Sequence, residues 1–162
     1  LLLHFGILNI STAFWRCMGV DVKELFRSPY KSKSLNEFWG KRWNMAFSEM
    51  TAQIVYRPLK DYGKTLAIIA SFLISGLLHE IAISVPVNSG YGLPLLYFML
   101  HAVLMQAEGK ILQVKRITSH KILAHVWVLG WLILPMPLLF HSEFIKLVIE
   151  PVRNEILNAI SL

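Results

Sequence analysis

Apolar residues gather along the chain into four long runs, at positions 1–20, 65–85, 93–107 and 122–141. A helix needs about 20 mostly apolar residues to cross the hydrocarbon core of a bilayer. The pattern therefore predicts an all-α fold, a polytopic bundle of about four transmembrane helices. The run 93–107 is short for a span and contains His101, so we expect it to extend past Glu108 or to lie against other helices.

The charges between these runs predict the orientation of the bundle. Segment 21–64 holds nine Lys and Arg against five acidic residues, 108–121 holds four against one, and the turn 86–92 holds no charge. With four alternating spans, both basic segments fall on one side of the membrane and the neutral turn on the other. By the positive-inside rule, the basic segments are predicted to be cytoplasmic.

Composition supports a membrane protein. The chain has 162 residues, of which 55% are hydrophobic and only 16% charged, and its net charge is +6. A soluble domain carries about 25% charged residues, and this hydrophobic content also excludes a disordered chain. The excess positive charge lies beside the spans and no nucleic-acid recognition motif accompanies it, so the expected partner is the lipid bilayer and not nucleic acid.

Two features of the chain bear on its origin. Cys17 is the one cysteine and has no disulfide partner in the chain, which excludes a disulfide-stapled secreted scaffold. The first residue is Leu1, inside an apolar run that lacks the basic start and cleavage site of a signal peptide. We therefore interpret residues 1–162 as the C-terminal part of one longer domain, with upstream helices missing.

Segment 21–64 also contains a helix signal. Ser34 and Glu37 fit a capping box, which predicts a helix beginning at Leu35. Apolar residues then recur at helical spacing and predict one amphipathic helix on the membrane interface or on the bundle. This stripe consists of Leu35, Phe38, Trp39, Trp43, Ala46 and Met50. Arg57 followed by Pro58 is expected to stop or kink the helix.

Prolines interrupt two further stretches. Pro135 and Pro137 lie inside the run 122–141 and predict a kink whose freed carbonyl groups are satisfied by neighbouring helices. Residues 143–162 alternate apolar and charged positions around Pro151. This stretch is predicted to form a C-terminal helical region, either a short interfacial helix pair or a final tilted span.

The candidate chemistry centres on His79 and Glu80, two adjacent ionisable residues inside a predicted span. Such groups are costly in a bilayer unless they face a cavity or a partner, which makes them functional candidates. Adjacent helical positions differ by about 100°, so the two side chains cannot reach the same substrate atom. His79 is suited to act as a neutral base and Glu80 to bind a polar group on a neighbouring helix, while a hydrogen-bonded packing histidine is an equally common alternative.

Two other chemistries are weaker. Ser75 lies one helical turn before His79 and could form a nucleophile pair with it, but no strand-turn-helix elbow is present, and Ser75 with Gly76 is more typical of close helix packing. The six histidines do not show the clustered spacing of membrane di-iron enzymes, so no metal is expected. Polar contacts between helices are the better interpretation of His101 and His125.

Two motifs together carry a family resemblance. Residues 34–44 read SLNEFWGKRWN, and SGLLHE follows at 75–80 on a hydrophobic helix. This ordered pair resembles the signature of the membrane-bound O-acyltransferases, in particular the wax synthase-like branch. The resemblance covers residues 34–80 directly and the rest of the chain by hydropathy. It implies that His79 is the catalytic histidine and Asn44 the second active-site residue, although Asn44 alone would be interpreted as a solvated polar residue.

The resemblance further implies an acyltransferase that esterifies a lipid alcohol, as in wax ester synthesis. Acyl-CoA serves as co-substrate and no cofactor is required. Asn44 would stabilise the oxyanion or hold the substrate. The basic residues Lys41 and Arg42 are expected to meet the anionic end of acyl-CoA, and Glu80 is a further candidate for substrate binding. Trp39 and Trp43 are candidates for substrate contact, although their stripe is more typical of packing.

Several alternatives stay open at this point. The acceptor could be a sterol, a diacylglycerol or a small metabolite hydroxyl, and a homo-oligomer is compatible with the sequence. A non-enzymatic transport or assembly subunit, with His79 and Glu80 as a proton relay or structural pair, is the rival from another class. The family resemblance implies a multi-pass membrane protein, in the endoplasmic reticulum if the source is eukaryotic.

Overall fold

The computed structural model describes residues 10, 14–19, 25–110 and 120–160, and within these ranges every regular element is a helix. The all-α prediction is confirmed for this part of the chain. The predicted span 1–20 falls mostly outside the described residues, as do parts of both basic segments.

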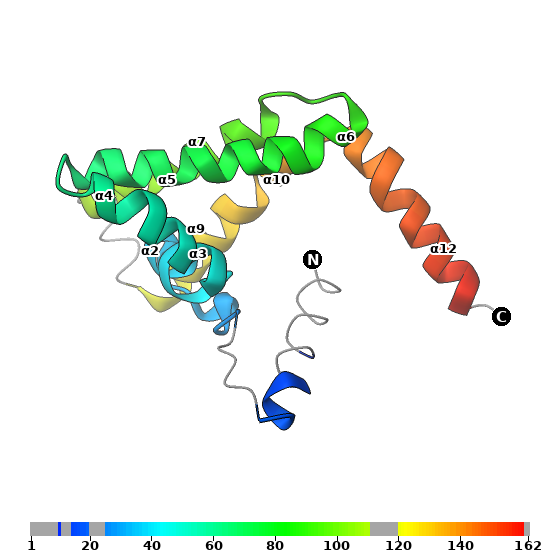
Figure 1. Cartoon of the computed structure of the whole chain (residues 1–162), viewed down its shortest axis with the longest axis horizontal. Coiled ribbons are helices and arrows are strands. Elements are labelled where there is room, and N and C mark those ends of the chain that lie inside the picture. The colour runs from blue at the N-terminus through cyan, green and yellow to red at the C-terminus, as the bar shows by residue number, and fades with distance from the viewer. Residues whose placement is uncertain (1–9, 11–13, 20–24, 111–119, 161–162) are drawn as a thin grey trace.

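The centre of the fold is a pair of antiparallel helices. Three consecutive elements, α5 (Lys64–His79), the π-helical turn η4 (Glu80–Ser84) and α6 (Val85–Val87), form one continuous helix. It lies alongside α7 (Leu93–Lys110), to which it is joined by a short turn (Figure 1). Gly76 permits this close approach, because a Cβ atom there would lie 2.7 Å from Cδ1 of Leu95 and 3.0 Å from its Cα.

A third apolar helix is broken by proline. Helix α9 (Lys121–Ile133) ends before Pro135, and the short helix α10 (Met136–Leu139) follows. The carbonyl oxygen of Leu132, at the end of α9, accepts a hydrogen bond from the hydroxyl of Tyr97 on α7, with an O–O distance of 3.4 Å. The helix is thus broken at the prolines, as predicted. Pro135 and Pro137 free the carbonyl groups of Trp131 and Ile133, so the satisfaction of these two groups by neighbouring helices stays a prediction.

Two helical stretches among the described residues are long and apolar enough to cross a membrane: Lys64–Val87 and Lys121–Leu139. Only 28% of the most apolar part of each is buried inside the protein. Their remaining apolar surface therefore faces outward, which fits a lipid environment better than the core of a soluble protein. Helix α7 occupies the third predicted span without meeting this criterion, so the bundle of four spans is not confirmed.

Segment 25–63 folds as a chain of short helices against this frame. They are η1 (Pro29–Lys31), α2 (Leu35–Glu37), the π-helical turn η2 (Phe38–Arg42), α3 (Met45–Thr51), the π-helical turn η3 (Ala52–Tyr56) and α4 (Arg57–Leu59). The helix begins at Leu35 as predicted, and the Ser34 hydroxyl accepts a hydrogen bond from the N–H of Glu37 at 2.9 Å. The carboxylate of Glu37 accepts from the N–H of Lys33, one residue before the position that a standard capping box uses.

The single amphipathic helix predicted for this segment is wrong. Trp43 is extended and Asn44 has a φ of 42°, so the first helix ends at Arg42 and α3 starts in a new direction. Ala46 and Met50, assigned to the apolar stripe, are consequently exposed. Arg57 and Pro58 were expected to stop or kink the helix. They do not stop it, since it continues through both residues to Leu59, and the π-helical turn η3 directly precedes them.

Glu108, near the end of α7, anchors the start of this segment. Its carboxylate accepts hydrogen bonds from the backbone N–H groups of Leu35 and Asn36 at 2.7 and 3.1 Å, and from Nε1 of Trp127 on α9 at 2.9 Å. One carboxylate therefore holds together α2, α7 and α9.

The C-terminal region is one helix. Its parts are α11 (Ser142–Phe144), the π-helical turn η5 (Ile145–Ile149) and α12 (Glu150–Ile160), which extends away from the rest of the fold (Figure 1). Pro151 does not divide it, so the helix pair, one of the two expected alternatives, is wrong, and the final tilted span stays a prediction. Whether this helix lies in a membrane interface stays a prediction.

Candidate active site

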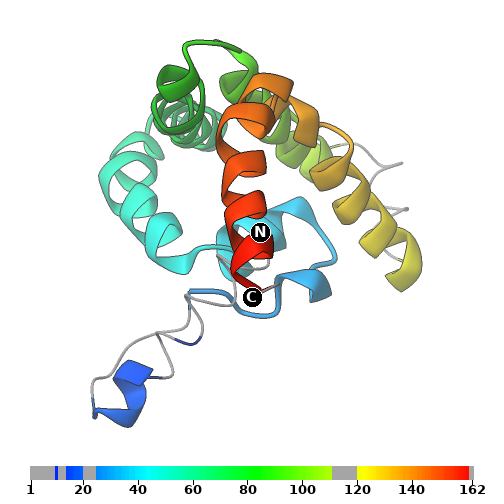
Figure 2. The ribbon, with the colours of Figure 1, turned by 90° about the vertical axis from the view of Figure 1, so that its right-hand side faces the viewer.

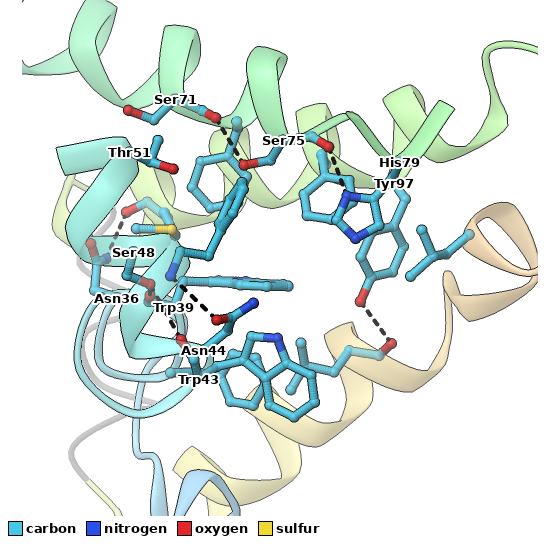
Figure 3. Close-up of a pocket in the computed structure, with 18 of the residues that line it drawn as sticks. Asn36, Trp39, Trp43, Asn44, Ser48, Thr51, Ser71, Ser75, His79 and Tyr97 are labelled. Carbon is cyan, nitrogen blue, oxygen red and sulfur yellow. Dashed lines mark hydrogen bonds between the residues drawn. The ribbon is translucent and has the colours of Figure 1, made fainter. Parts of the chain in front are cut away.

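A cavity of about 790 Å³ lies between segment 36–56, α5, α7 and the α9–α10 pair. Figure 2 shows α3 and α9 on opposite sides of the space that α5 and α7 cover. Most of the cavity wall is apolar. Its polar lining residues include Asn36, Asn44, Ser48, Thr51, Ser71, Ser75, His79 and Tyr97 (Figure 3).

His79 presents one free ring nitrogen to this cavity. Its Nδ1 lies 2.7 Å from the carbonyl oxygen of Ser75, one turn earlier on α5. Because a carbonyl oxygen can only accept, Nδ1 carries the proton in the neutral ring and Nε2 carries the lone pair. The ring packs on Phe98 of α7 with a centroid distance of 4.3 Å. His79 is thus held with the lone pair of Nε2 directed toward the cavity (Figure 3).

Asn44 lies on the opposite wall of the same cavity (Figure 3). Its Oδ1 accepts a hydrogen bond from the N–H of Phe47 at 3.3 Å and so caps α3. Asparagine suits both demands of this position, since it tolerates positive φ and is a preferred N-cap. The amide nitrogen of Asn44 points into the cavity, where it can donate a hydrogen bond (Figure 3).

The local turn that carries Asn44 is fixed by Ser48. The hydroxyl of Ser48 lies 2.9 Å from the carbonyl oxygen of Trp39 and 3.2 Å from that of Trp43, and it donates to this pair. The side chains of Trp39 and Trp43, which were predicted from the sequence as candidates for substrate contact, both line the cavity. Trp39 also packs edge-on against Phe72 of α5, so it serves the core as well.

Three polar side chains follow one face of α5 into the cavity. The hydroxyls of Ser71 and Ser75 each donate to the carbonyl oxygen four residues earlier, at 2.8 and 3.0 Å, and His79 repeats this pattern. Ser75 therefore gives its proton to Ser71 and not to the ring of His79. This geometry does not support Ser75 as a nucleophile paired with His79.

The remaining charged candidates do not line the cavity. Arg42 forms a salt bridge with Glu37 at 2.6 Å and donates to the carbonyl oxygen of Arg27 at 2.9 Å, which stabilises the motif itself. Lys41 is exposed. Glu80 accepts hydrogen bonds from the N–H groups of Gly92 and Leu95 at 2.6 and 3.3 Å, so it caps the start of α7.

His101 contributes to the packing of the fold. His101 is fully buried and its Nδ1 contacts the carbonyl oxygen of Tyr97 at 2.8 Å. In the part of the chain that the structure describes, no group of three His, Cys, Asp or Glu residues is placed to hold a metal ion. Sequence reasoning did not single out Tyr97 or Glu108, because each acts through contacts with residues far away in the sequence. It also missed Ser48, whose contacts depend on the turn at Asn44.

Known proteins resemble the segment that carries His79, Asn44 and much of the cavity wall. Residues 22–100 match the model of the membrane bound O-acyl transferase family. A probable long-chain-alcohol O-fatty-acyltransferase 7 of Arabidopsis thaliana is 34% identical over 101 residues, which are 56% of this chain and 30% of that protein. The long-chain-alcohol O-fatty-acyltransferase of Simmondsia chinensis is 27% identical over 152 residues, 82% of this chain and 43% of that protein.

A further relative differs in its acceptor. It is an acyl-CoA–sterol O-acyltransferase 1 of Arabidopsis thaliana, 32% identical over 84 residues, which are 46% of this chain and 24% of that protein. The chain thus spans less than half the length of these curated relatives. No solved structure matches the chain.

Proposed function

The chain belongs, through residues 22–100, to the membrane bound O-acyl transferase family, and on this premise we propose that the whole protein transfers a fatty acyl group from coenzyme A to a lipid alcohol. The acceptor that we propose is a long-chain alcohol and the product a wax ester. The relatives named long-chain-alcohol O-fatty-acyltransferases support this acceptor.

One observation carries the proposal. His79 and Asn44 come from separate motifs and lie 35 positions apart in the sequence, and both side chains line one cavity from opposite walls. A hydroxyl group and a thioester carbonyl group between these walls would have a base on one side and a hydrogen-bond donor on the other. This is the pair of groups that acyl transfer to an alcohol requires.

In the proposed reaction, Nε2 of His79 takes the proton from the alcohol as its oxygen attacks the thioester carbonyl carbon. The amide N–H of Asn44 stabilises the negative charge that develops on the carbonyl oxygen. The C–S bond then breaks, the ester leaves, and the thiolate of coenzyme A takes the proton back from the His79 ring. General-base catalysis of this kind contributes about 10²–10⁴ in rate. The reaction needs no further cofactor.

The surroundings fit the two substrates. The cavity walls are mostly apolar and accept hydrocarbon chains, for example against Phe72, Leu132 and Phe140. Lys41 is exposed at the motif, where it can attract the anionic nucleotide end of acyl-CoA from the cytoplasm. Arg42, in contrast, is engaged by Glu37, so we now propose an indirect role for it. We also propose that the whole protein crosses the endoplasmic reticulum membrane several times.

The test uses the full-length protein in microsomes with labelled acyl-CoA and a panel of acceptors: a long-chain alcohol, a sterol, diacylglycerol and a small hydroxylated compound. We expect ester formation with the long-chain alcohol. A sterol ester as the main product would favour the second acceptor class, to which one relative belongs by name. Absence of every ester would favour the non-enzymatic alternative.

His79→Ala tests the base in the same assay, and the expected loss is about 10²-fold or more with membrane insertion retained. His125→Ala is the matched control, because Nδ1 of His125 makes the same contact with a carbonyl oxygen four residues earlier, at 2.6 Å, outside the cavity. Equal activity of the His79→Ala variant and the control would rule out the proposed base.

A further inference from the structure

Tyr97 brings a hydroxyl group to the cavity wall beside His79. Its side chain comes from α7, lines the cavity and is only 3% exposed. The rings of Tyr97 and His79 both pack on Phe98, with centroid distances of 5.4 and 4.3 Å. Figure 3 shows the Tyr97 hydroxyl on the same side of the cavity as the His79 ring.

The present partner of this hydroxyl holds it weakly. The O–O distance to the Leu132 carbonyl oxygen is 3.4 Å, whereas O–H···O bonds are usually 2.7–2.8 Å long. The hydroxyls of Ser71, Ser75 and Ser48 donate to backbone carbonyls at 2.8, 3.0 and 2.9 Å. Of these four hydroxyls, that of Tyr97 therefore loses least when it donates its hydrogen bond to a ligand and not to its backbone partner.

A packing role alone does not require the oxygen atom. A phenylalanine would fill the same space against Phe98 and the ring of His101, which lies 4.3 Å from Tyr97. A buried hydroxyl costs free energy unless it is well hydrogen-bonded, and the long bond to Leu132 compensates that cost poorly. The oxygen is therefore better explained by a ligand that completes its hydrogen bonding.

We propose that Tyr97 binds the hydroxyl group of the acceptor alcohol and holds it against His79. The proposal rests on the function proposed above and names the residue that orients its acceptor. The alcohol donates its O–H to Nε2 of His79 and accepts a hydrogen bond from the Tyr97 hydroxyl, which releases Leu132. Two contacts fix the position of the attacking oxygen, which one contact with His79 would leave free to rotate.

The test measures binding and needs no turnover. The full-length protein in detergent is titrated with 12-bromododecan-1-ol and with 1-bromododecane, which lacks the hydroxyl group. Bromine quenches tryptophan fluorescence at short range, and Trp39 and Trp43 line the cavity. We expect the wild type to bind the alcohol about tenfold more tightly than the alkane, as one or two net hydrogen bonds allow.

The variant Tyr97→Phe should reduce this preference to about threefold or less while the affinity for the alkane stays unchanged. Tyr91→Phe is the matched control, since Tyr91 is exposed and its hydroxyl donates to Asn88 on the turn before α7. An unchanged preference in Tyr97→Phe would overturn the proposal. An equal loss of affinity for the alcohol and for the alkane would overturn it as well, because the Tyr97 hydroxyl would then serve only to hold α9 in place.

A second ligand keeps the test independent of how well the variant folds. The methyl ether of 12-bromododecan-1-ol can accept a hydrogen bond from Tyr97 but cannot donate one to His79. In the wild type, the ether should bind about threefold more tightly than the alkane, and equal affinities would contradict the proposal. Failure of the proposed function would show separately, as absence of ester product despite this binding preference.

Discussion

The buried carboxylate of Glu108 accepts a hydrogen bond from the backbone N–H of Leu35 at 2.7 Å, across 73 positions of the sequence. Leu35 is fully buried and begins α2, within the motif that carries Trp39, Trp43 and Asn44. The contact therefore places one wall of the cavity relative to α7, the helix that supports His79 through Phe98. It does so without touching the cavity itself.

Removal of this carboxylate should destabilise the protein. In Glu108→Ala, the N–H groups of Leu35 and Trp127 lose a charged acceptor inside the fold, and each such loss costs about 1–3 kcal/mol. We expect a total loss of about 2–4 kcal/mol, measured as a fall in melting temperature in detergent. Glu155→Ala on the exposed helix α12 is the control, with an expected change below about 0.5 kcal/mol. Equal melting temperatures of the two variants would contradict the role of Glu108.

Alanine at two helical glycines should have opposite effects. In Gly76→Ala, the new Cβ meets the Cα of Leu95 at 3.0 Å, so α5 and α7 must separate, at a cost of about 1–3 kcal/mol. In Gly130→Ala on α9, no atom lies within 4 Å of the new Cβ, and the better helix propensity of alanine stabilises by up to about 1 kcal/mol. The melting temperatures of the two variants measure these changes in stability. A change of the same sign in both would contradict the close packing at Gly76.

The two roles of Asn44 can be separated by Asn44→Asp. Aspartate also caps helices and tolerates positive φ, so the melting temperature should change little. The substitution removes the amide N–H donor. The ester-forming activity should fall about 10²-fold, since the loss of one preorganised donor to an oxyanion lowers kcat by about that factor. Asn88→Asp is the matched control, because Asn88 has a φ of 48° and its Oδ1 accepts from Tyr91 outside the cavity. Full activity of Asn44→Asp would show that the cap is the whole role of Asn44.

Stability should depend on the ionisation of Glu37. The backbone N–H of Lys33 and the guanidinium group of Arg42 hold the pKa of Glu37 below its ordinary value of 4.5. A lowered pKa in the folded state stabilises the protein above the ordinary pKa, and this stabilisation is lost as the pH falls through the lowered value. Glu37→Gln should therefore melt at a lower temperature than the wild type near pH 7, with the difference shrinking below pH ~4. A difference that does not change with pH would contradict the ion pair.

The hydrophobic pattern predicted the helices better than their interruptions. Residues 65–85 were predicted as a span, and the structure has an apolar helix from Lys64 to Val87. Pro151 was expected to interrupt its helix and Pro58 to stop or kink its own, but the helices continue through both, because each of these prolines, like Pro86, follows a π-helical turn by two positions. In each turn the residue before the proline donates to the carbonyl oxygen five positions earlier, and this wider geometry admits the ring. Pro135 has no such turn before it and ends α9.

The site was predicted where a motif marks it and missed where packing creates it. His79 and Asn44 were singled out from the resemblance, and both line the cavity. Helical periodicity alone had assigned Asn44 to a solvated face, because a pattern of apolar positions carries no signal for the left-handed turn at this residue. Tyr97 depends on its contact with Leu132 of another helix, and no spacing within the sequence reports that contact.

The hydroxyls of Ser71 and Ser75 have consequences for inhibitor design. Each hydroxyl donates its hydrogen to a backbone carbonyl oxygen of α5. Toward a ligand in the cavity, these two side chains therefore present oxygen lone pairs and act as hydrogen-bond acceptors. An inhibitor scaffold with amide or urea N–H groups along this wall would meet matching acceptors. A scaffold that turned its carbonyl groups toward the same wall would place acceptors against acceptors, and no hydrogen bond could form. Inhibitor design for this cavity should therefore begin from compounds rich in N–H donors.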